Sequence, residues 1–99
     1  MRVAAIVPAF NEQKTIAGVG RVLKKSPLIG EVIVISDGSK DKTAPLAREA
    51  GADMVHELPW RHGKGSAMSH GVTHTDADIL FFADADLSGF TVEHIESIV

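Results

Sequence analysis

Short apolar runs alternate with amphipathic stretches along the whole 99-residue chain. The apolar runs are too short for helices and are rich in β-branched residues, so they predict buried strands. Between them, hydrophobic residues recur at helical spacing, as Ile16, Val19 and Leu23 do on one face of the first amphipathic stretch. The expected strands cover 3–7, 31–35, 53–56 and 79–83. The expected helices cover 12–25, 42–50 and 63–71, with a last one after Thr91.

Proline, glycine and small polar residues mark the expected ends of these elements. Pro8 should stop the first strand, and Asn11 should cap the helix that follows. Residues 36–39 are typical of a turn, and Asp41 should cap the second helix. Each expected strand is therefore followed by a short polar connection.

The alternation of strand and helix predicts an α/β fold in one domain. We expect a Rossmann-like, mostly parallel sheet of about four strands, with helices on both faces. Ligands of such sheets bind beyond the carboxyl ends of the strands. Four polar stretches fall at that edge: 8–12, 36–39, the loop up to residue 64, and 84–86. The sequence thus predicts one site assembled from four separate segments.

Two carboxylates, Asp84 and Asp86, directly follow the apolar run 79–82, which should be buried on both faces. If the strand stays extended, its period of two places both carboxylates on the same side. Such a pair suits Mg²⁺ or Mn²⁺ bridging a diphosphate. The alternative is a solvated strand end whose acidic residues cap the next segment.

A flexible basic turn, Gly63-Lys64-Gly65, opens the third expected helix. It is not a phosphate-binding P-loop, because Leu58 stands where that loop has glycine and Gly65 where it has a hydroxyl residue. Backbone N–H groups and Lys64 could still meet an anion at the start of a helix. The alternative is an ordinary glycine-rich helix start.

The polar stretches after the first two strands offer contacts for a nucleoside. Asp37 could accept a hydrogen bond from the imide N–H of a base such as uracil, or could merely form a turn. Phe10 and Glu12 could line a pocket for the base or ribose, although a lone phenylalanine more often packs in the core. Arg61 and His62 could reach a phosphate, but packing or solvation explains them equally well.

Two histidines, His70 and His74, lie four residues apart and so share a helical face. This spacing suggests a zinc site, but Gly71 stands where the zinc-protease pattern has glutamate. Solvated helix histidines are therefore the favoured interpretation.

The composition excludes several classes of protein. The absence of cysteine rules out disulfides and thiolate metal sites. A net charge of −3 argues against nonspecific binding of nucleic acid. No apolar run approaches the roughly 20 residues of a membrane span, and the one in Met1–Pro8 is too short for a signal peptide. We therefore expect a cytoplasmic protein.

Taken together, the four polar stretches resemble the N-terminal half of family 2 glycosyltransferases with the A-type fold. The segments that carry the resemblance are 7–12, 35–43, 63–67 and 84–87, in the family's order and spacing. The resemblance covers essentially all 99 residues and extends to polyprenyl-phosphate sugar transferases and glucosyl-3-phosphoglycerate synthase-like enzymes. One departure is Ser36, where the family usually has aspartate.

The resemblance implies that residues 1–99 form the nucleotide-sugar-binding half of an incomplete A-type domain, without its acceptor-binding half. It assigns binding of the nucleotide sugar to Pro8, Ala9, Phe10, Glu12, Asp37, Gly63, Lys64 and Asp84. It assigns Mg²⁺ or Mn²⁺ to Asp86, shared with Asp84. Asp37 would bind the base, and Lys64 would lie near the base or diphosphate.

The implied reaction is an inverting transfer of a hexose from a UDP- or GDP-linked sugar. The acceptor would be a polyprenyl phosphate or a small phosphorylated metabolite, and the general base would lie beyond residue 99. The 99 residues alone should then be inactive. The full-length protein could associate with membranes, and the open sheet edge could pair with a second copy.

Three alternatives remain. A sugar-nucleotide nucleotidyltransferase would need a glycine-rich, arginine-containing loop after the first strand, where 8–11 reads Pro-Ala-Phe-Asn. A haloacid-type phosphatase places its Asp-x-Asp after the first strand, whereas here it follows the fourth. A noncatalytic nucleotide-binding module would fit if 99 residues were the whole product.

Overall fold

The computed structural model describes residues 2–83 and residue 85, and it confirms the α/β fold. The described residues form four strands and three helices, which alternate strictly from the first strand to the last. The elements are β1 (Val3–Ala9), α1 (Ile16–Lys25), β2 (Glu31–Asp37), α2 (Thr43–Glu49), β3 (Met54–Leu58), α3 (Lys64–Val72) and β4 (Ile79–Phe82). The helix expected after Thr91 lies outside the described residues.

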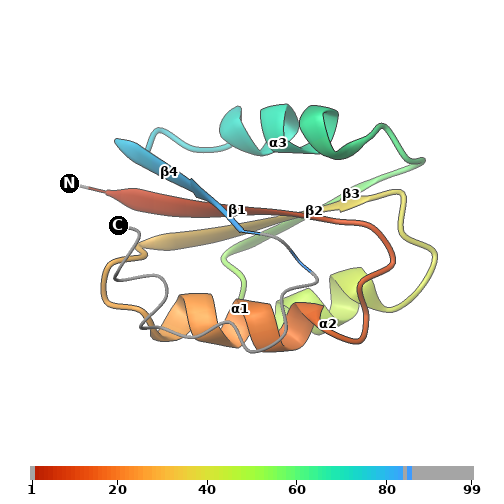
Figure 1. Ribbon diagram of the computed structural model, residues 1–99, viewed down its shortest axis with the longest axis horizontal. Helices are drawn as coiled ribbons and strands as arrows, with labels where there is room; N and C mark the ends of the chain where they lie inside the picture. The colour runs from red at the N-terminus through yellow and green to blue at the C-terminus, as the bar shows by residue number, and fades with distance from the viewer. Residues whose placement is uncertain (1, 84, 86–99) are drawn as a thin grey trace.

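The sheet is parallel throughout, with the strand order β3-β2-β1-β4. Figure 1 shows α1 and α2 covering one face of the sheet and α3 covering the other. The sheet grows from β1 through β2 to β3 in one direction, and the chain then returns to place β4 on the other side of β1. This reversal is a topological switch point, beside which α/β proteins bind ligands at the carboxyl ends of the strands.

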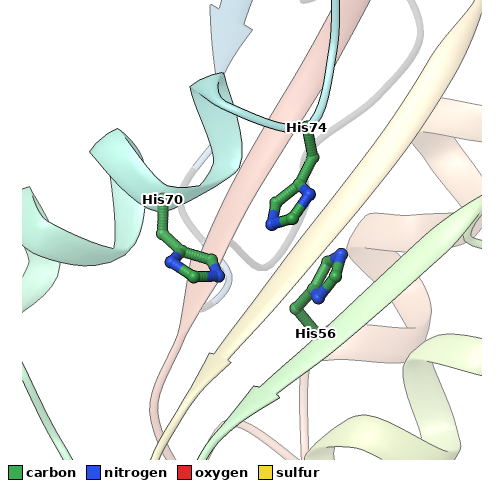
Figure 2. A group of neighbouring side chains, drawn as sticks. All are labelled: His56, His70 and His74. Carbon is green, nitrogen blue, oxygen red and sulfur yellow. The ribbon is translucent and has the colours of Figure 1, made fainter.

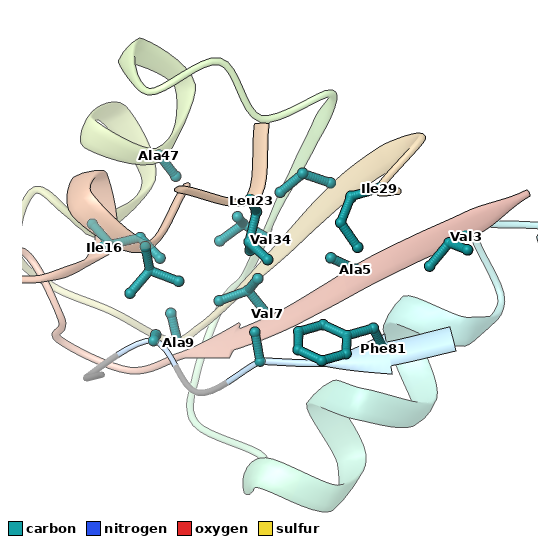
Figure 3. Close-up of a cluster of buried hydrophobic side chains, with 14 residues drawn as sticks. Val3, Ala5, Val7, Ala9, Ile16, Leu23, Ile29, Val34, Ala47 and Phe81 are labelled. Atoms are coloured by element: carbon teal, nitrogen blue, oxygen red, sulfur yellow. The ribbon is translucent and has the colours of Figure 1, made fainter. Parts of the chain in front are cut away.

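The larger core lies between the sheet and the helices α1 and α2 (Figure 3). Every residue of β1 is buried, because both faces of this central strand are covered by helices. Ile16 and Leu23 of α1 are fully buried, as their spacing predicted. Burial of one such side chain contributes about 1.5–3 kcal/mol, so this face of α1 fixes the helix on the sheet.

The opposite face of the sheet packs closely against α3. Ile33, Ile35 and Ala67 form a second, smaller core there. A Cβ at Gly71 would lie 2.5 Å from Cγ2 of Ile6, so the helix backbone almost touches β1 at this point. Glycine is required here for close packing of the helix on the sheet.

The first strand does not stop at Pro8, contrary to the sequence prediction, and continues to Ala9. The backbone oxygen of Ile6 accepts a hydrogen bond from the N–H of Ala83, so residue 6 faces β4. Residue 8 faces the same side because strands have a period of two. The β1–β4 ladder ends at Ile6 and Phe82, so the missing N–H of Pro8 costs no ladder bond.

Two further predictions about the connections were wrong. Asn11 does not cap α1: Thr15 occupies that position, and Asn11 has a positive φ of 51°. Its side-chain oxygen instead accepts a hydrogen bond from the N–H of Lys40, 2.9 Å away. The 36–39 turn begins only at Gly38, since Ser36 and Asp37 still belong to β2.

The fourth strand is an edge strand of the described sheet and is not buried on both faces as the sequence predicted. Phe82 is 42% exposed and Ile79 is 37% exposed, whereas Phe81 lies in the larger core. The continuous apolar run 79–82 did not reveal whether this strand lies at the edge or in the centre of the sheet. Of the helices among the described residues, none has the length and apolar character to cross a bilayer.

Candidate functional site

An open pocket of about 230 Å³ lies at the carboxyl edge of the sheet. It is lined by Pro8, Ala9, Phe10, Glu12, Asp37, Arg61, Lys64 and Ala67. All of these except Arg61 and Ala67 were assigned to the nucleotide sugar from the sequence. Ala67 was missed, although it lies three residues after Lys64 and therefore on the same face of α3. The structure thus brings three of the four polar stretches into one pocket.

The chemistry of the pocket is mixed. The end of β1 supplies apolar surface through Pro8 and Ala9. Carboxylates come from Glu12 and Asp37, and cations come from Arg61 and Lys64. The guanidinium of Arg61 lies 4.3 Å from the centre of the Phe10 ring, a cation–π contact that joins the 60–63 loop to the end of β1. The pocket therefore offers both acceptors for a base and cations for an anion.

Asp37 is almost completely buried, with 3% of its surface exposed, at the end of β2. Its Oδ1 accepts a hydrogen bond from the backbone N–H of His62 at 2.8 Å, and its Oδ2 accepts one from that of Gly63 at 2.9 Å. The Nδ1 atom of His62 also lies 3.4 Å from Oδ1. Asp37 therefore holds the 60–63 loop against β2. Each carboxylate oxygen has a second lone pair, which leaves an acceptor for a ligand.

Gly63, assigned to the nucleotide sugar from the sequence, does not line the pocket. It is the residue before α3, has a φ of 105°, and gives its N–H to Asp37. Its place in the structure is thus at the anchored start of α3 rather than in the pocket wall.

Glu12 is positioned by the start of α2. Its backbone N–H donates to the hydroxyl of Thr43 at 2.9 Å, and that hydroxyl in turn donates to Oδ1 of Asp41. Oδ1 also accepts the N–H of Thr43 at 3.0 Å, and Oδ2 accepts that of Gln13 at 3.2 Å. Asp41 was expected to cap α2; Lys42 occupies the cap position, and Asp41 binds the first turn from one residue earlier.

Asp41 is expected to stabilise the chain only while it is ionised. Partial burial acts to raise its pKa, but the hydrogen bonds from Thr43 and Gln13 outweigh burial and lower the pKa below its ordinary 3.8. The contribution is therefore complete above about pH 4 and disappears as the pH falls through the lowered pKa. Asp41→Asn should lose about 1 kcal/mol of unfolding free energy at neutral pH, because hydrogen bonds to a charged acceptor are replaced by bonds to a neutral one. Urea denaturation at several pH values measures this loss.

The two proteins should converge in stability once the pH falls below the lowered pKa of Asp41, because the wild-type side chain is then protonated. A stability difference that stays constant as the pH falls through and below the ordinary aspartate range would contradict the role of the ionised carboxylate.

Of the predicted metal-binding segment 84–86, the structure describes only Ala85. Its side chain is 1% exposed in the larger core, and its carbonyl oxygen accepts a hydrogen bond from the hydroxyl of Thr15 at 2.6 Å. The main chain at this position therefore lies against the beginning of α1. Asp84 and Asp86 lie outside the described residues, and the metal site assigned to them stays a prediction.

A second group of polar side chains lies away from the pocket, between β3 and the end of α3. His56, His70 and His74 point toward one another there (Figure 2), and we call them the histidine cluster. All three are partly buried; for His70 and His74 this differs from the solvated state favoured from the sequence. Burial lowers the pKa of His56, and positive charge on His74 and His70 would lower it further. His56 is consequently a neutral imidazole at neutral pH.

Comparison with known proteins gives concordant results. The model of the family described as glycosyl transferase family 2 matches residues 4–99. A 4,4'-diaponeurosporenoate glycosyltransferase of Staphylococcus aureus is 35% identical over 98 residues, which are 95% of this chain and 26% of that protein. The chain thus spans about a quarter of the length of the curated relatives that it matches.

The fold also resembles solved structures of glucosyl-3-phosphoglycerate synthase from Mycobacterium tuberculosis. One, in complex with Mn²⁺, UDP and glucosyl-3-phosphoglycerate, is 31% identical with a TM-score of 0.84. Another, in complex with Mg²⁺ and UDP, is 31% identical with a TM-score of 0.83. In each case the similarity covers 96% of this chain and 37% of the other. With the family model matching nearly its whole length, this chain belongs to glycosyl transferase family 2 and has the corresponding A-type α/β fold.

Proposed function

We propose that this chain is the nucleotide-sugar-binding half of a glycosyltransferase, and that the pocket binds the nucleoside diphosphate of a UDP- or GDP-linked sugar. The observation that carries the proposal is the convergence of β1, β2, the 60–63 loop and α3 on one pocket, which joins carboxylates to cations. The family match favours this function over a sugar-nucleotide nucleotidyltransferase. A volume of about 230 Å³ is below the roughly 300–1,000 Å³ of drug-sized ligands, which suits a nucleoside better than a whole nucleotide sugar.

The roles of the side chains follow from their chemistry. Uracil and guanine carry N–H donors, which Asp37 and Glu12 can accept at the carboxyl edge of the sheet. Phe10 supports the base side of the pocket together with the apolar end of β1. Lys64 is the first residue of α3, so its charge and the positive end of the helix dipole act on the same diphosphate. Arg61 adds a second cation from the loop.

We further propose that Asp86, shared with Asp84, holds Mg²⁺ or Mn²⁺ against the diphosphate. Carboxylate oxygens suit these hard cations. A bound cation would neutralise charge on the departing nucleoside diphosphate. The related synthase has been solved with Mn²⁺ or Mg²⁺ and UDP.

The complete reaction would be an inverting hexosyl transfer. The acceptor would be a polyprenyl phosphate or a small phosphorylated metabolite, and the related synthase has been solved with phosphoglyceric acid. The general base and the acceptor site would lie in a part of the parent enzyme beyond residue 99. The 99 residues alone should then bind nucleotide without turnover.

Calorimetry with UDP and GDP, with and without Mn²⁺, tests the proposal. Mn²⁺ should strengthen nucleotide binding, and Asp86→Ala should abolish this effect. Lys64→Ala should weaken binding about tenfold even without Mn²⁺, because a charge-assisted contact to phosphate is lost. Lys25→Ala is the matched control, since Lys25 is an exposed lysine at the far end of α1.

Binding that does not depend on Mn²⁺ and is unchanged in both variants would contradict the proposal. An equal loss of nucleotide affinity in Lys25→Ala and Lys64→Ala would also contradict the proposal, because the effect would then come from the overall charge of the protein.

A further inference from the structure

The histidine cluster joins two elements that are far apart in the sequence. His56 lies in the middle of the edge strand β3, His70 lies near the end of α3, and His74 follows that helix. Figure 2 shows the rings of His70 and His74 on the α3 side facing the ring of His56 on the strand. One ring nitrogen from each residue lies within 4.8 Å of those of the other two. Among the described residues, no other group of three such side chains comes this close.

The nitrogens of the cluster lack the partners that buried polar atoms normally have. Nε2 of His56 and Nε2 of His74 are both buried and make no hydrogen bond. These two rings are stacked, with centroids 3.8 Å apart and an angle of 16° between their planes. A buried, unpaired nitrogen is costly unless something else occupies its lone pair. The cluster therefore has unused capacity for a ligand that accepts lone pairs.

We propose that His56, His70 and His74 bind one divalent transition-metal ion, with Zn²⁺ the expected occupant, through one imidazole nitrogen each. Three neutral imidazoles suit Zn²⁺, Co²⁺, Ni²⁺ or Cu²⁺, whereas Mg²⁺ and Mn²⁺ prefer oxygen ligands. Three protein ligands leave the fourth position of a tetrahedral ion open to water. The site is therefore chemically distinct from the carboxylate site proposed for the nucleotide.

The observed spacing requires a modest rearrangement. Tetrahedral Zn²⁺ with Zn–N bonds of about 2.0–2.1 Å holds its ligand nitrogens roughly 3.3 Å apart. The cluster nitrogens lie up to 4.8 Å apart, so the rings must turn about their side-chain bonds to converge. The stacked pair of His56 and His74 has to rotate most, while the backbones are already placed by β3 and α3.

The position of the site suggests a structural effect of the metal. Gly71 seats α3 directly against Ile6, which brings His70 and His74 down toward the sheet. An ion here would tie β3 to the C-terminal end of α3. None of the three histidines lines the pocket, and His70 lies six residues after Lys64, or about 9 Å along the helix axis. The ion would instead fix the helix whose first residue lines the pocket.

Titration of the metal-free 99-residue chain with Co²⁺ tests the site, read by the visible d–d absorption of tetrahedral Co²⁺. One tetrahedral Co²⁺ ion per chain should bind, and Zn²⁺ should displace it while Mg²⁺ does not. His56→Gln, His70→Gln and His74→Gln should each weaken binding by more than about 100-fold, since loss of even an outer partner costs 10–100-fold. His62→Gln is the matched control, because His62 lies on the pocket loop outside the cluster.

Asp86→Ala should leave the tetrahedral Co²⁺ absorption unchanged, which separates failure of this site from failure of the nucleotide site. Circular dichroism checks that each variant folds. If a variant does not fold, the Co²⁺ titration of the wild type still tests the proposal. Absence of saturable tetrahedral Co²⁺ in the wild type would overturn the proposal. Unchanged binding in folded cluster variants, or an equal loss in His62→Gln, would overturn it as well.

Discussion

Replacing Gly38 with alanine is expected to lower the unfolding free energy by about 2–5 kcal/mol and to disrupt nucleotide binding. Gly38 has a φ of 74°, which strains any residue with a Cβ. The added Cβ would also lie 2.3 Å from the backbone nitrogen of Arg61 and 2.4 Å from the carbonyl carbon of Trp60. These are main-chain atoms, so the 60–63 loop must move away from β2. Urea denaturation and UDP calorimetry measure the two effects.

Gly51→Ala is the matched control for this steric effect. Gly51 also has a positive φ, of 95°, but the nearest atom to its added Cβ is Cγ of Lys24 at 3.7 Å. This variant should show only the backbone strain, about 1–2 kcal/mol, and should bind UDP normally. Equal losses of stability and of UDP affinity in the two variants would show that contact with the loop is unimportant.

Asp37→Ala is expected to lower the unfolding free energy by about 2–4 kcal/mol and to reduce UDP affinity at least tenfold. The substitution leaves the N–H groups of His62 and Gly63, which are part-buried, without their acceptors. The loop should then detach from β2, and Arg61 and the start of α3 should lose their fixed positions. Amide hydrogen exchange reports this directly as lost protection at residues 62 and 63.

Asp37→Asn separates the charge from the shape of the side chain. Asparagine keeps one oxygen acceptor but presents an NH₂ donor to the other N–H group. Its stability and its amide protection should therefore be intermediate between those of the wild type and Asp37→Ala. If protection at residues 62 and 63 persists in Asp37→Ala, the carboxylate does not hold the loop.

Local patterns in the sequence were sufficient to predict the strands, the helices and the edge at which the pocket lies. The run from Val32 to Ile35 became the buried centre of β2, and the spacing of Ile16, Val19 and Leu23 became the buried face of α1. The prediction that Pro8 ends the first strand was wrong. A proline interrupts a strand only where its missing N–H would have bonded to a neighbouring strand, and β4 ends before it reaches Pro8. The burial of β4 misled for a related reason, since apolar content does not reveal strand order.

The sequence predicted which segments meet at the pocket, but not which atoms contact one another there. Residues such as Glu12 and Lys64 could be assigned because each follows a strand or begins a helix. The bonds from Asp37 to the backbone of residues 62 and 63 span about 25 positions and leave no pattern in side-chain identity. The sequence suggested a zinc site at His70 and His74, but His56 was missed for the same reason, because only strand pairing places it opposite the end of α3.

The attachment of the 60–63 loop through Asp37 has a consequence for how binding selectivity can change. Asp37 bonds to main-chain N–H groups, which every residue except proline possesses. The anchoring of residues 62 and 63 is therefore independent of the side chain at position 61. Exchanging Arg61 removes its contact with Phe10 but leaves these two backbone hydrogen bonds in place. Position 61 is thus a natural starting point for changing which nucleotide the proposed pocket binds, with the anchored loop as a constant frame.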